Sequence, residues 1–343
     1  MKKWLPALLV CSMFVNAANA QNESPLPHFE GIVNAIQRVN EKYLVYMSTI
    51  AHSNNVRKAE RKRQDLLEQI DKSRYAIADL PLYKSDRSLA KATTDYFKLM
   101  SNDLNENYAK IVNLEEIAEQ SYDNMEAYLL LRKRVAEKMK AAGDTMELRE
   151  EEYCKKYNIT LSKAEDEMSR KMQQSAEVSN YNENIYLIFF KCSAQETELM
   201  KALDKKNVTS MEQIKSAMVK YANEGLAKLD TTKNFGSDPS LKAACKRTLE
   251  FFKKEADKMS ICTDFIMKEE SFEQIKKAFQ GNASAKSNKD EIDKYNKAVN
   301  ELNNASNTFN QNNDYLNKYR ADAYKDFNEA SAAFLDSHMP YAK

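Results

Sequence analysis

A run of basic side chains between residues 51 and 65 carries the groups best suited to binding an anion. Arg57 and Arg61 are four residues apart, as are Lys58 and Lys62, so each pair lies on one face of a helix. With His52 and Arg63 they form the densest positive segment of the chain and predict a site for an anionic partner, such as a lipid head group, a glycan or an acidic protein surface. The alternative is an ordinary exposed helix face, whose charges are balanced by Glu60, Asp65 and Glu68.

The sequence contains few residues or motifs that could form an acid–base, metal or phosphate-binding site. Of the three histidines, His28 and His338 occupy ordinary surface positions near the ends of the chain, which leaves His52 as the one plausible acid–base group. There is no HExxH motif, no histidine pair at helical spacing and no zinc-ligand set. The motifs GxxxxGK[ST], GxGxxG and GxSxG are also missing. The sequence therefore predicts no catalytic residue, no metal site and no cofactor.

Four cysteines follow the first twenty residues, namely Cys154, Cys192, Cys245 and Cys262. An even number in an oxidising compartment favours disulfides. Cys245 and Cys262 are about 25 Å apart if they share one helix, which is too far for a direct bond. Counting residues from the turn near Gly236 favours the pairs Cys192–Cys262 and Cys154–Cys245. Four buried, unpaired thiols are the alternative, and no CxxC spacing suggests redox or zinc chemistry.

A row of polar residues interrupts the apolar pattern near the C-terminus. Ser306, Asn313 and Arg320 are seven residues apart and continue the row of Val299 and Phe327. If buried, they need polar partners, because an unpaired buried polar group costs a few kcal/mol. They could line a polar cleft, but a structural polar layer at the edge of a bundle is the simpler interpretation.

Long helices must position all of these side chains. Glycine and proline number only 5 and 6, too few for the turns of a sheet. Apolar residues recur at helical spacing near the N-terminus, and the last helix repeats its apolar positions every seven residues, at Tyr295, Leu302, Phe309 and Leu316. The sequence predicts an all-α fold, an elongated bundle of about six long helices.

Two similar peptides suggest an internal duplication. Residues 85–92 read SDRSLAKA and residues 237–244 read SDPSLKAA, and weaker echoes flank both in the same order. We expect two tandem three-helix units, residues 29–180 and 181–338, in which Tyr153 matches Tyr315. Each SD dipeptide would cap the start of its unit's second helix. Chance similarity between helix-rich segments is the alternative.

The N-terminus predicts export. Residues 1–20 combine two lysines, a short apolar run and Ala18-Asn19-Ala20, as in a cleaved signal peptide. A lipoprotein anchored at Cys11 is the alternative, although Val10 fits a lipobox poorly. We expect a flexible segment at 21–28, a tail at 339–343, and the periplasm or outer surface of a Gram-negative bacterium. No later segment predicts a membrane span. Removing Lys2 and Lys3 leaves 50 basic and 51 acidic residues, a balance that argues against nucleic-acid binding.

Residues 46–63, YMSTIAHSNNVRKAERKR, resemble the N-terminal helix of an uncharacterised family of helical surface or envelope proteins first noted in spirochaetes. Those proteins share a tyrosine, then Ala-His, then an Ala/Val-Arg-Lys segment and a basic run. The resemblance covers about a fifth of the chain. It implies an envelope location and a helical fold, and it supplies no activity, ligand or catalytic residue.

Together these patterns favour a non-enzymatic envelope or surface protein that acts as a helical scaffold, adaptor or interaction module, with an envelope protein or glycan as partner. The alternative is a periplasmic carrier that holds a small apolar or amphipathic ligand between its helical units. That alternative is motivated by 15 Met, 18 Tyr and 14 Phe, which suit an adaptable pocket but also suit a helical core.

Overall fold

The computed structural model describes residues 24–53, 55–111, 122–161, 167–282, 285 and 288–342. These residues form eight α-helices and no β-strand, which confirms the predicted all-α class. The helices are α1 (Leu26–His52), α2 (Val56–Ala78), α3 (Ser88–Ile111), α5 (Tyr122–Lys156), α6 (Glu167–Asp204), α7 (Val208–Thr231), α8 (Ser240–Gly281) and α9 (Lys289–His338).

The chain divides into two compact units. Unit 1 comprises the described residues up to Tyr181 together with those from Ala332 onward, and unit 2 is Asn182–Ser331. The boundary therefore falls inside α6 and again inside α9.

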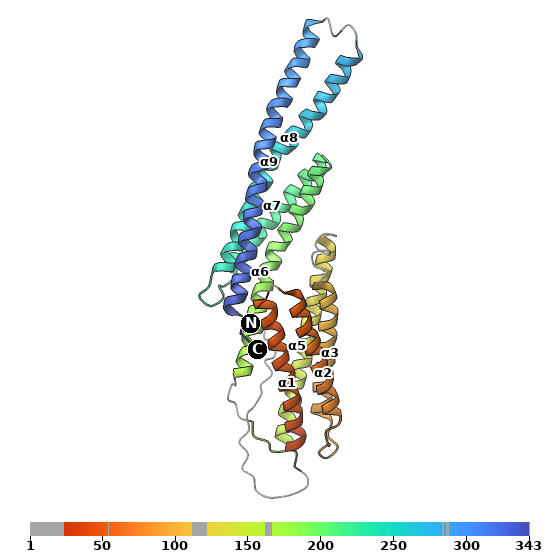
Figure 1. Cartoon of the computed structure of the whole chain (residues 1–343), viewed down its shortest axis with the longest axis vertical. Coiled ribbons are helices and arrows are strands. Elements are labelled where there is room, and N and C mark those ends of the chain that lie inside the picture. The colour runs from red at the N-terminus through yellow and green to blue at the C-terminus, as the bar shows by residue number, and fades with distance from the viewer. Residues whose placement is uncertain are drawn as a thin grey trace. The chain divides into compact units, whose positions relative to one another are not determined.

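Unit 1 contains α1, α2, α3 and α5, which run alternately up and down (Figure 1), together with the start of α6 and the end of α9. Ser73 of α2 donates a hydrogen bond to the carbonyl of Ala35 in α1 over 3.1 Å. Arg63 of α2 reaches the carbonyl of Leu104 in α3 over 3.3 Å. The end of α5 returns to the start of α1, where the Tyr153 hydroxyl lies 3.3 Å from the carbonyl oxygen of Pro25. All four helices contribute to one apolar core.

His28 is part of this core, which corrects the surface position expected from the sequence. It is 2% exposed, and its Nδ1 lies 3.1 Å from the carbonyl oxygen of Pro81 in the α2–α3 turn. Burial lowers the pKa of His28, although the Pro81 carbonyl and the charge of Asp86 act in the opposite direction. The imidazole joins the first turn of α1 to the α2–α3 turn and is a structural group.

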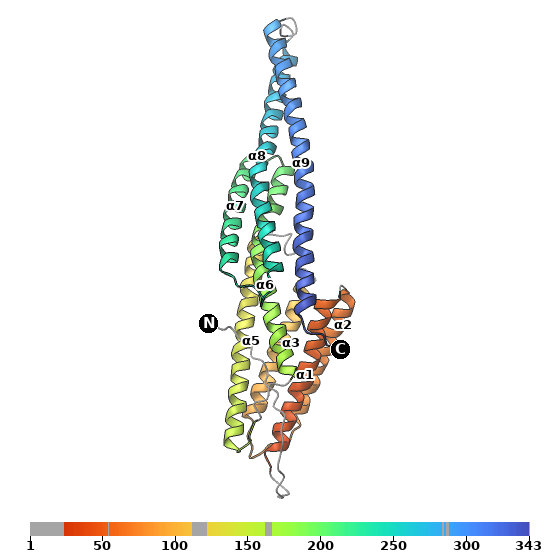
Figure 2. The same ribbon diagram turned by 90° about the vertical axis from the view of Figure 1, so that its left-hand side faces the viewer.

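Unit 2 also contains four antiparallel helical segments, from α6 to α9. The centre of its core is aromatic, since Phe189 of α6 stacks on Phe327 of α9 with ring centroids 4.0 Å apart, and Phe252 of α8 lies beside them. Gly225 lets α7 approach closely, because a Cβ at this position would lie 2.8 Å from Leu249 of α8. Beyond the α6–α7 turn, α8 and α9 continue as a two-helix hairpin (Figure 2).

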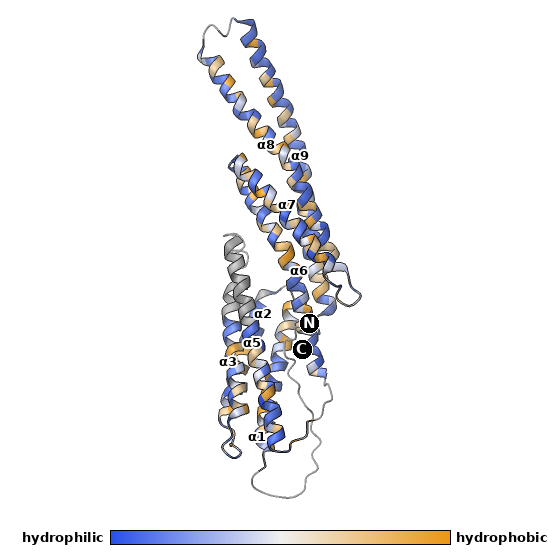
Figure 3. Cartoon of the chain, turned by 180° about the vertical axis from the view of Figure 1, so that it is seen from behind, coloured by the Kyte–Doolittle hydropathy of each residue, from blue (hydrophilic) through white to orange (hydrophobic). Residues whose placement is uncertain are grey.

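Helices of both units carry apolar and polar residues in turn. Figure 3 shows apolar and polar residues alternating along the helices of both units. In α8 the buried positions recur every three or four residues, at Leu241, Cys245, Leu249 and Phe252. This spacing places them on one stripe facing the other helices of the unit. In α9 the predicted heptad row is only partly in the core, since Leu316 is buried but Tyr295, Leu302 and Phe309 are half-buried.

The predicted count of six long helices is too low, because short asparagine-capped turns interrupt two of them. α1 ends at His52 and α2 begins at Val56, where the Asn55 side chain accepts a hydrogen bond from the amide of Lys58 over 3.0 Å. Asn207 caps α7 in the same way, through the amide of Ser210. An asparagine cap satisfies an amide that would otherwise lack a partner, so the chain can reverse there without a proline. Unit 2 consequently has four helical segments where three were expected, and the described part of unit 1 has α1, α2, α3 and α5 with the start of α6 and the end of α9.

The two SD dipeptides are helix caps, as predicted. Asp86 accepts a hydrogen bond from the Ser88 amide over 3.0 Å, and Asp238 accepts one from the Ser240 amide over 2.8 Å. Both caps precede the third helix of their unit, α3 and α8, whereas the second had been expected.

The expected match of Tyr153 with Tyr315 is not supported by their surroundings. Tyr153 is 1% exposed, and its neighbour Tyr157 donates a hydrogen bond to Asp86, so this part of α5 lies level with the cap. Tyr315 is 38% exposed and lies under the ammonium group of Lys258, about five helical turns into α8.

Across the described ranges, no helix is both long enough and apolar enough to cross a lipid bilayer. The predicted signal peptide at 1–20 lies outside the residues that the structure describes, as does Cys11.

Candidate functional site

The five predicted basic residues do not form one patch, because His52 is engaged elsewhere in unit 1. His52 ends α1 and contacts the C-terminal segment, with Nδ1 2.8 Å from Asp336 and Nε2 3.1 Å from the carbonyl oxygen of Met339. Tyr341 stacks on its ring with centroids 3.6 Å apart. Only 9% of the His52 side chain is exposed. The imidazole thus fastens the chain's C-terminal segment and is poorly placed for acid–base catalysis.

The three carboxylates expected to balance the basic segment pair with two cations of that segment, Arg63 and Lys62, and with Lys72 beyond it. Glu60 receives two hydrogen bonds from Arg63, at 2.8 and 2.9 Å. Asp65 pairs with Lys62 at 3.1 Å, and Glu68 pairs with Lys72 at 2.6 Å. The exposed-face alternative therefore accounts for Lys62, whose charge is balanced by Asp65.

Arg57, Lys58 and Arg61 are therefore left without an ion-pair partner among the residues that the structure describes. All three are exposed, in the first two turns of α2, and the first turn contains no acidic residue. A helix N-terminus already carries a partial positive charge, so cations there are mildly destabilising. We define these three residues as the basic patch. It adds repulsion at a place where acidic residues would stabilise the helix.

The four described cysteines form no disulfide in this structure, which therefore does not support the predicted pairs Cys192–Cys262 and Cys154–Cys245. No two of them are at disulfide distance, and all four are buried. In unit 2 the thiols face the backbone of neighbouring helices, since Cys192 donates to the Met218 carbonyl at 3.4 Å and Cys245 to the Ile185 carbonyl at 3.8 Å. Burial raises the pKa of each of these two thiols to about 12, so they stay protonated at neutral pH. The residue-counting argument failed because it could not show which way each side chain points.

Arg320 belongs to a buried polar cluster, as the structural-layer interpretation expected. Its Nε lies 3.0 Å from Oε1 of Glu255 in α8 and 2.7 Å from Oε1 of Glu196 in α6. Its Nη2 also donates to Glu255. The other oxygen of Glu196 accepts a hydrogen bond from the Tyr324 hydroxyl over 3.0 Å. We call Glu196, Glu255, Arg320 and Tyr324 the ion cluster.

The other members of the predicted polar row are not in the ion cluster. Ser306 and Asn313 are half-buried, and the neighbouring Asn312 is the buried amide of α9. Its Nδ2 donates to the carbonyl of Lys258 over 3.2 Å and lies 3.8 Å from the sulfur of Cys262. Sequence reasoning missed Glu196 and Glu255 altogether. The available signal was their position on apolar stripes, since Glu255 lies three residues after the buried Phe252 and four before the buried Met259.

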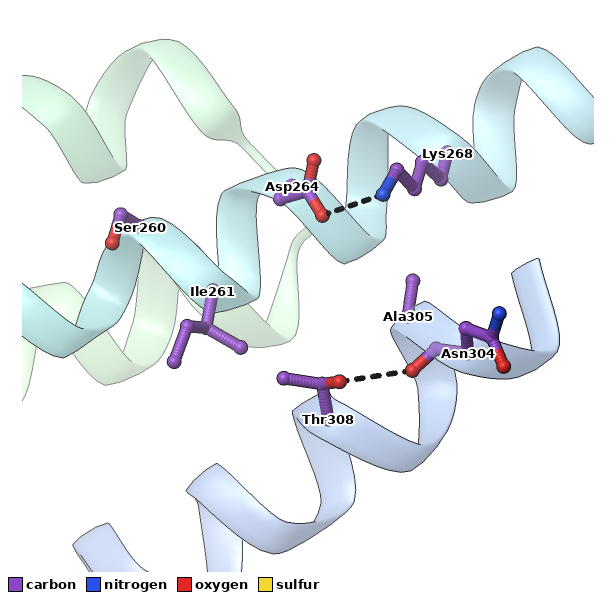
Figure 4. A pocket seen from close by; sticks show the side chains of 7 residues that line it. All are labelled: Ser260, Ile261, Asp264, Lys268, Asn304, Ala305 and Thr308. Atoms are coloured by element: carbon purple, nitrogen blue, oxygen red, sulfur yellow. Dashed lines mark hydrogen bonds and ion pairs between the residues drawn. The ribbon is translucent and has the colours of Figure 1, made fainter. Parts of the chain in front are cut away.

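A small hollow lies between α8 and α9 (Figure 4). Its volume is about 250 Å³, and it is lined by Ser260, Ile261, Asp264, Lys268, Asn304, Ala305 and Thr308. Asp264 and Lys268 pair with each other at 3.1 Å, and Thr308 donates to the backbone carbonyl of Asn304. Polar groups that satisfy one another on an open surface do not resemble the apolar pocket of a carrier.

No group of His, Cys, Asp and Glu in the described ranges is arranged to hold a metal ion. Comparison with known proteins adds no relative: no family model, no curated protein and no solved structure matches the chain. The basic patch in unit 1 and the ion cluster in unit 2 are thus the two candidate sites.

Proposed function

We propose that this protein is a non-enzymatic, exported envelope or surface protein that acts as a helical interaction module, and that its basic patch binds an anionic partner. The observation that carries the proposal is the unpaired state of Arg57, Lys58 and Arg61 at the start of α2. Three exposed cations at a helix N-terminus oppose helix stability, so a structural role does not account for them. An acidic protein surface or a glycan acid would supply the missing negative charge.

The export part of the proposal rests on the sequence of residues 1–20, with its two lysines, short apolar run and small residues before position 21. Mass spectrometry of the mature N-terminus tests it. A chain that begins at Gln21 is the expected result, whereas a lipid-modified Cys11 would identify a lipoprotein.

The basic patch is tested with a charge-neutral triple variant, Arg57→Gln, Lys58→Gln and Arg61→Gln. The matched control is Lys254→Gln, Lys289→Gln and Lys294→Gln, which removes the same charge from exposed positions on α8 and α9. Each protein is titrated with an acidic peptide and with a uronic-acid oligosaccharide at several salt concentrations. We expect the patch variant alone to lose affinity and salt dependence. Equal binding by all three proteins would reject the patch as a binding site.

We also infer that units 1 and 2 descend from an internal duplication, in a form different from the three-helix version predicted. Each unit contains a run of four antiparallel helices, α1, α2, α3 and α5 in unit 1 and α6 to α9 in unit 2, and a capped SDxSL peptide precedes the third helix of each run. Leu89 and Leu241, the last residues of those peptides, are each 1% exposed. The two peptides should superpose when the four helices of each run are aligned in order. A best alignment that offsets them by a turn or more would favour chance similarity.

A further inference from the structure

The ion cluster has too few hydrogen-bond donors for its carboxylate oxygens. Nε of Arg320 carries a single proton, and it faces Oε1 of Glu255 at 3.0 Å and Oε1 of Glu196 at 2.7 Å. The proton is directed to Glu255, and Oε1 of Glu196 has no hydrogen-bond partner. Oε2 of Glu255 also has none. Two buried carboxylate oxygens are therefore unsatisfied in a site that contains one guanidinium.

The net charge of the ion cluster also indicates that one proton is missing. With both carboxylates ionised, Glu196, Glu255 and Arg320 would carry a net charge of −1. Glu255 is 0% exposed and Glu196 is 4% exposed, so water cannot stabilise that charge. One added proton makes the cluster neutral and supplies the missing hydrogen.

The groups that surround the ion cluster cannot supply the missing positive charge. On α9 the nearest titratable group is Tyr324, which donates to Glu196, and on α6 and α8 the neighbouring groups are the thiols of Cys192 and Cys262. The buried residues of α7 are Met211, Met218, Ala222, Gly225 and Leu229, none of which titrates. Arg320 also donates from Nη1 to Asn317, outside the pair of acids.

We propose that Glu196 and Glu255 together hold one proton in the folded protein, and that loss of this proton as the pH rises loosens the four-helix part of unit 2. The ion cluster joins α6, α8 and α9, so a repulsive pair of carboxylates would act on three helices at once. This device is independent of the basic patch.

The direction of titration agrees with this assignment. Burial raises the pKa of Glu255 to about 7, with a further contribution from Glu196, while Arg320 opposes the shift. Burial also raises the pKa of Glu196. In the unfolded chain both carboxyls ionise at their ordinary pKa of about 4.3. Stability is therefore highest below that value, falls as the pH rises toward 7, and levels off once the folded protein has also lost the proton.

The four cysteines provide a reporter for each unit. Cys192, Cys245 and Cys262 are buried in unit 2, and Cys154 is buried in unit 1. Pulse alkylation with N-ethylmaleimide, followed by peptide mass spectrometry, measures how often each thiol becomes accessible. The wild type and Glu255→Gln are compared at the same pH, from 5 to 8, so that the reagent's own pH dependence cancels. Glutamine has the shape of the protonated acid and does not titrate.

We expect unit 2 labelling of the wild type, relative to Glu255→Gln, to rise by up to about tenfold per pH unit between pH 5 and 7 and then to level off. The Cys154 ratio should stay flat. A unit 2 ratio that does not change with pH would overturn the proposal. If Glu255→Gln does not fold, Glu196→Gln serves in its place, with the same expectation.

Infrared spectroscopy gives a second readout that needs no variant of the ion cluster. In a Glu150→Gln background, which removes the buried carboxyl of unit 1, we expect a protonated carboxyl band at pH 6 that disappears between pH 6 and 8. Absence of that band at pH 6 would overturn the proposal even if every variant of the cluster unfolded.

Discussion

Arg320 and Glu255 form a buried ion pair between α9 and α8, with Nε of the arginine 3.0 Å from Oε1 of the glutamate. The Glu255 side chain is fully buried and that of Arg320 is 18% exposed. Removing one partner of a buried pair leaves an uncompensated charge, which costs more than the pair itself contributes. The two residues therefore make unit 2 sensitive to single substitutions.

Arg320→Met should lower the free energy of unfolding of unit 2 by about 3 to 5 kcal/mol at pH 8, because two carboxylates then lose their only cation. The control is Arg247→Met, which breaks an ion pair with Asp326 on the same two helices. That pair is 59% and 42% exposed, so its loss should cost less than about 1 kcal/mol. Urea unfolding followed by circular dichroism measures both. Equal losses would mean that burial of the ion cluster has no energetic effect.

Glu150→Gln should stabilise unit 1 at pH 8 and have little effect near pH 4. Burial and the neighbouring carboxylates Glu147 and Glu151 raise the pKa of Glu150 to about 7. The folded protein therefore holds a proton that the unfolded chain releases above its ordinary pKa, and wild-type stability falls between about pH 4.3 and 7. Glutamine removes this loss, which amounts to at most about 4 kcal/mol. Thermal unfolding at both pH values measures the gain.

The exposed Glu151→Gln provides the control for that experiment, because Glu151 lies next to Glu150 on α5 and is exposed. It should change stability little at pH 8. A gain for Glu151→Gln as large as that for Glu150→Gln would point to general charge repulsion on α5.

The mature protein should contain four thiols and no disulfide. Alkylation under native conditions at pH 8 should be slow for Cys192 and Cys245, because burial excludes the reagent and holds the thiol pKa at about 12. Alkylation after unfolding in the absence of a reductant should modify all four cysteines. Intact mass before and after reduction measures the difference, and a gain of two hydrogens on reduction would contradict the structure.

His52→Ala should destabilise unit 1 and release the C-terminal segment. The imidazole contacts Asp336 and Met339 and stacks on Tyr341. Losing the hydrogen bonds and the stacked ring should cost about 1 to 3 kcal/mol. Hydrogen exchange of residues 332–342 should rise in the variant. His338→Ala, a change in the same part of α9, is the control, and equal exchange in both variants would argue against a specific role for His52.

Much of the architecture could be predicted from local pattern. Scarce glycine and proline with apolar residues at helical spacing predicted the all-α class, and the SD dipeptides predicted the caps at Asp86 and Asp238. These features depend on neighbours within a few residues, so no knowledge of the tertiary structure was needed. The helix count was wrong because the break at 53–55 carries only a serine and two asparagines, a weaker signal than Leu80-Pro81-Leu82.

The direction in which a side chain points, and the residues that it contacts, depended on the tertiary structure. The sequence placed His52 with Arg57 and Arg61, but the turn after α1 directs His52 to the C-terminal segment, almost three hundred residues away in the chain. The sequence favoured a Cys192–Cys262 disulfide, whereas in the structure each of these two thiols contacts a residue of a neighbouring helix.

The ion cluster illustrates the same division. Arg320 could be recognised as a polar residue on an apolar row, because its position on the helix follows from spacing alone. Its partners Glu196 and Glu255 lie 124 and 65 residues away, on helices whose register depends on how all four core faces fit together. Local sequence determined which residues lie on the inner stripes of these helices, and tertiary contacts decided which charges meet there.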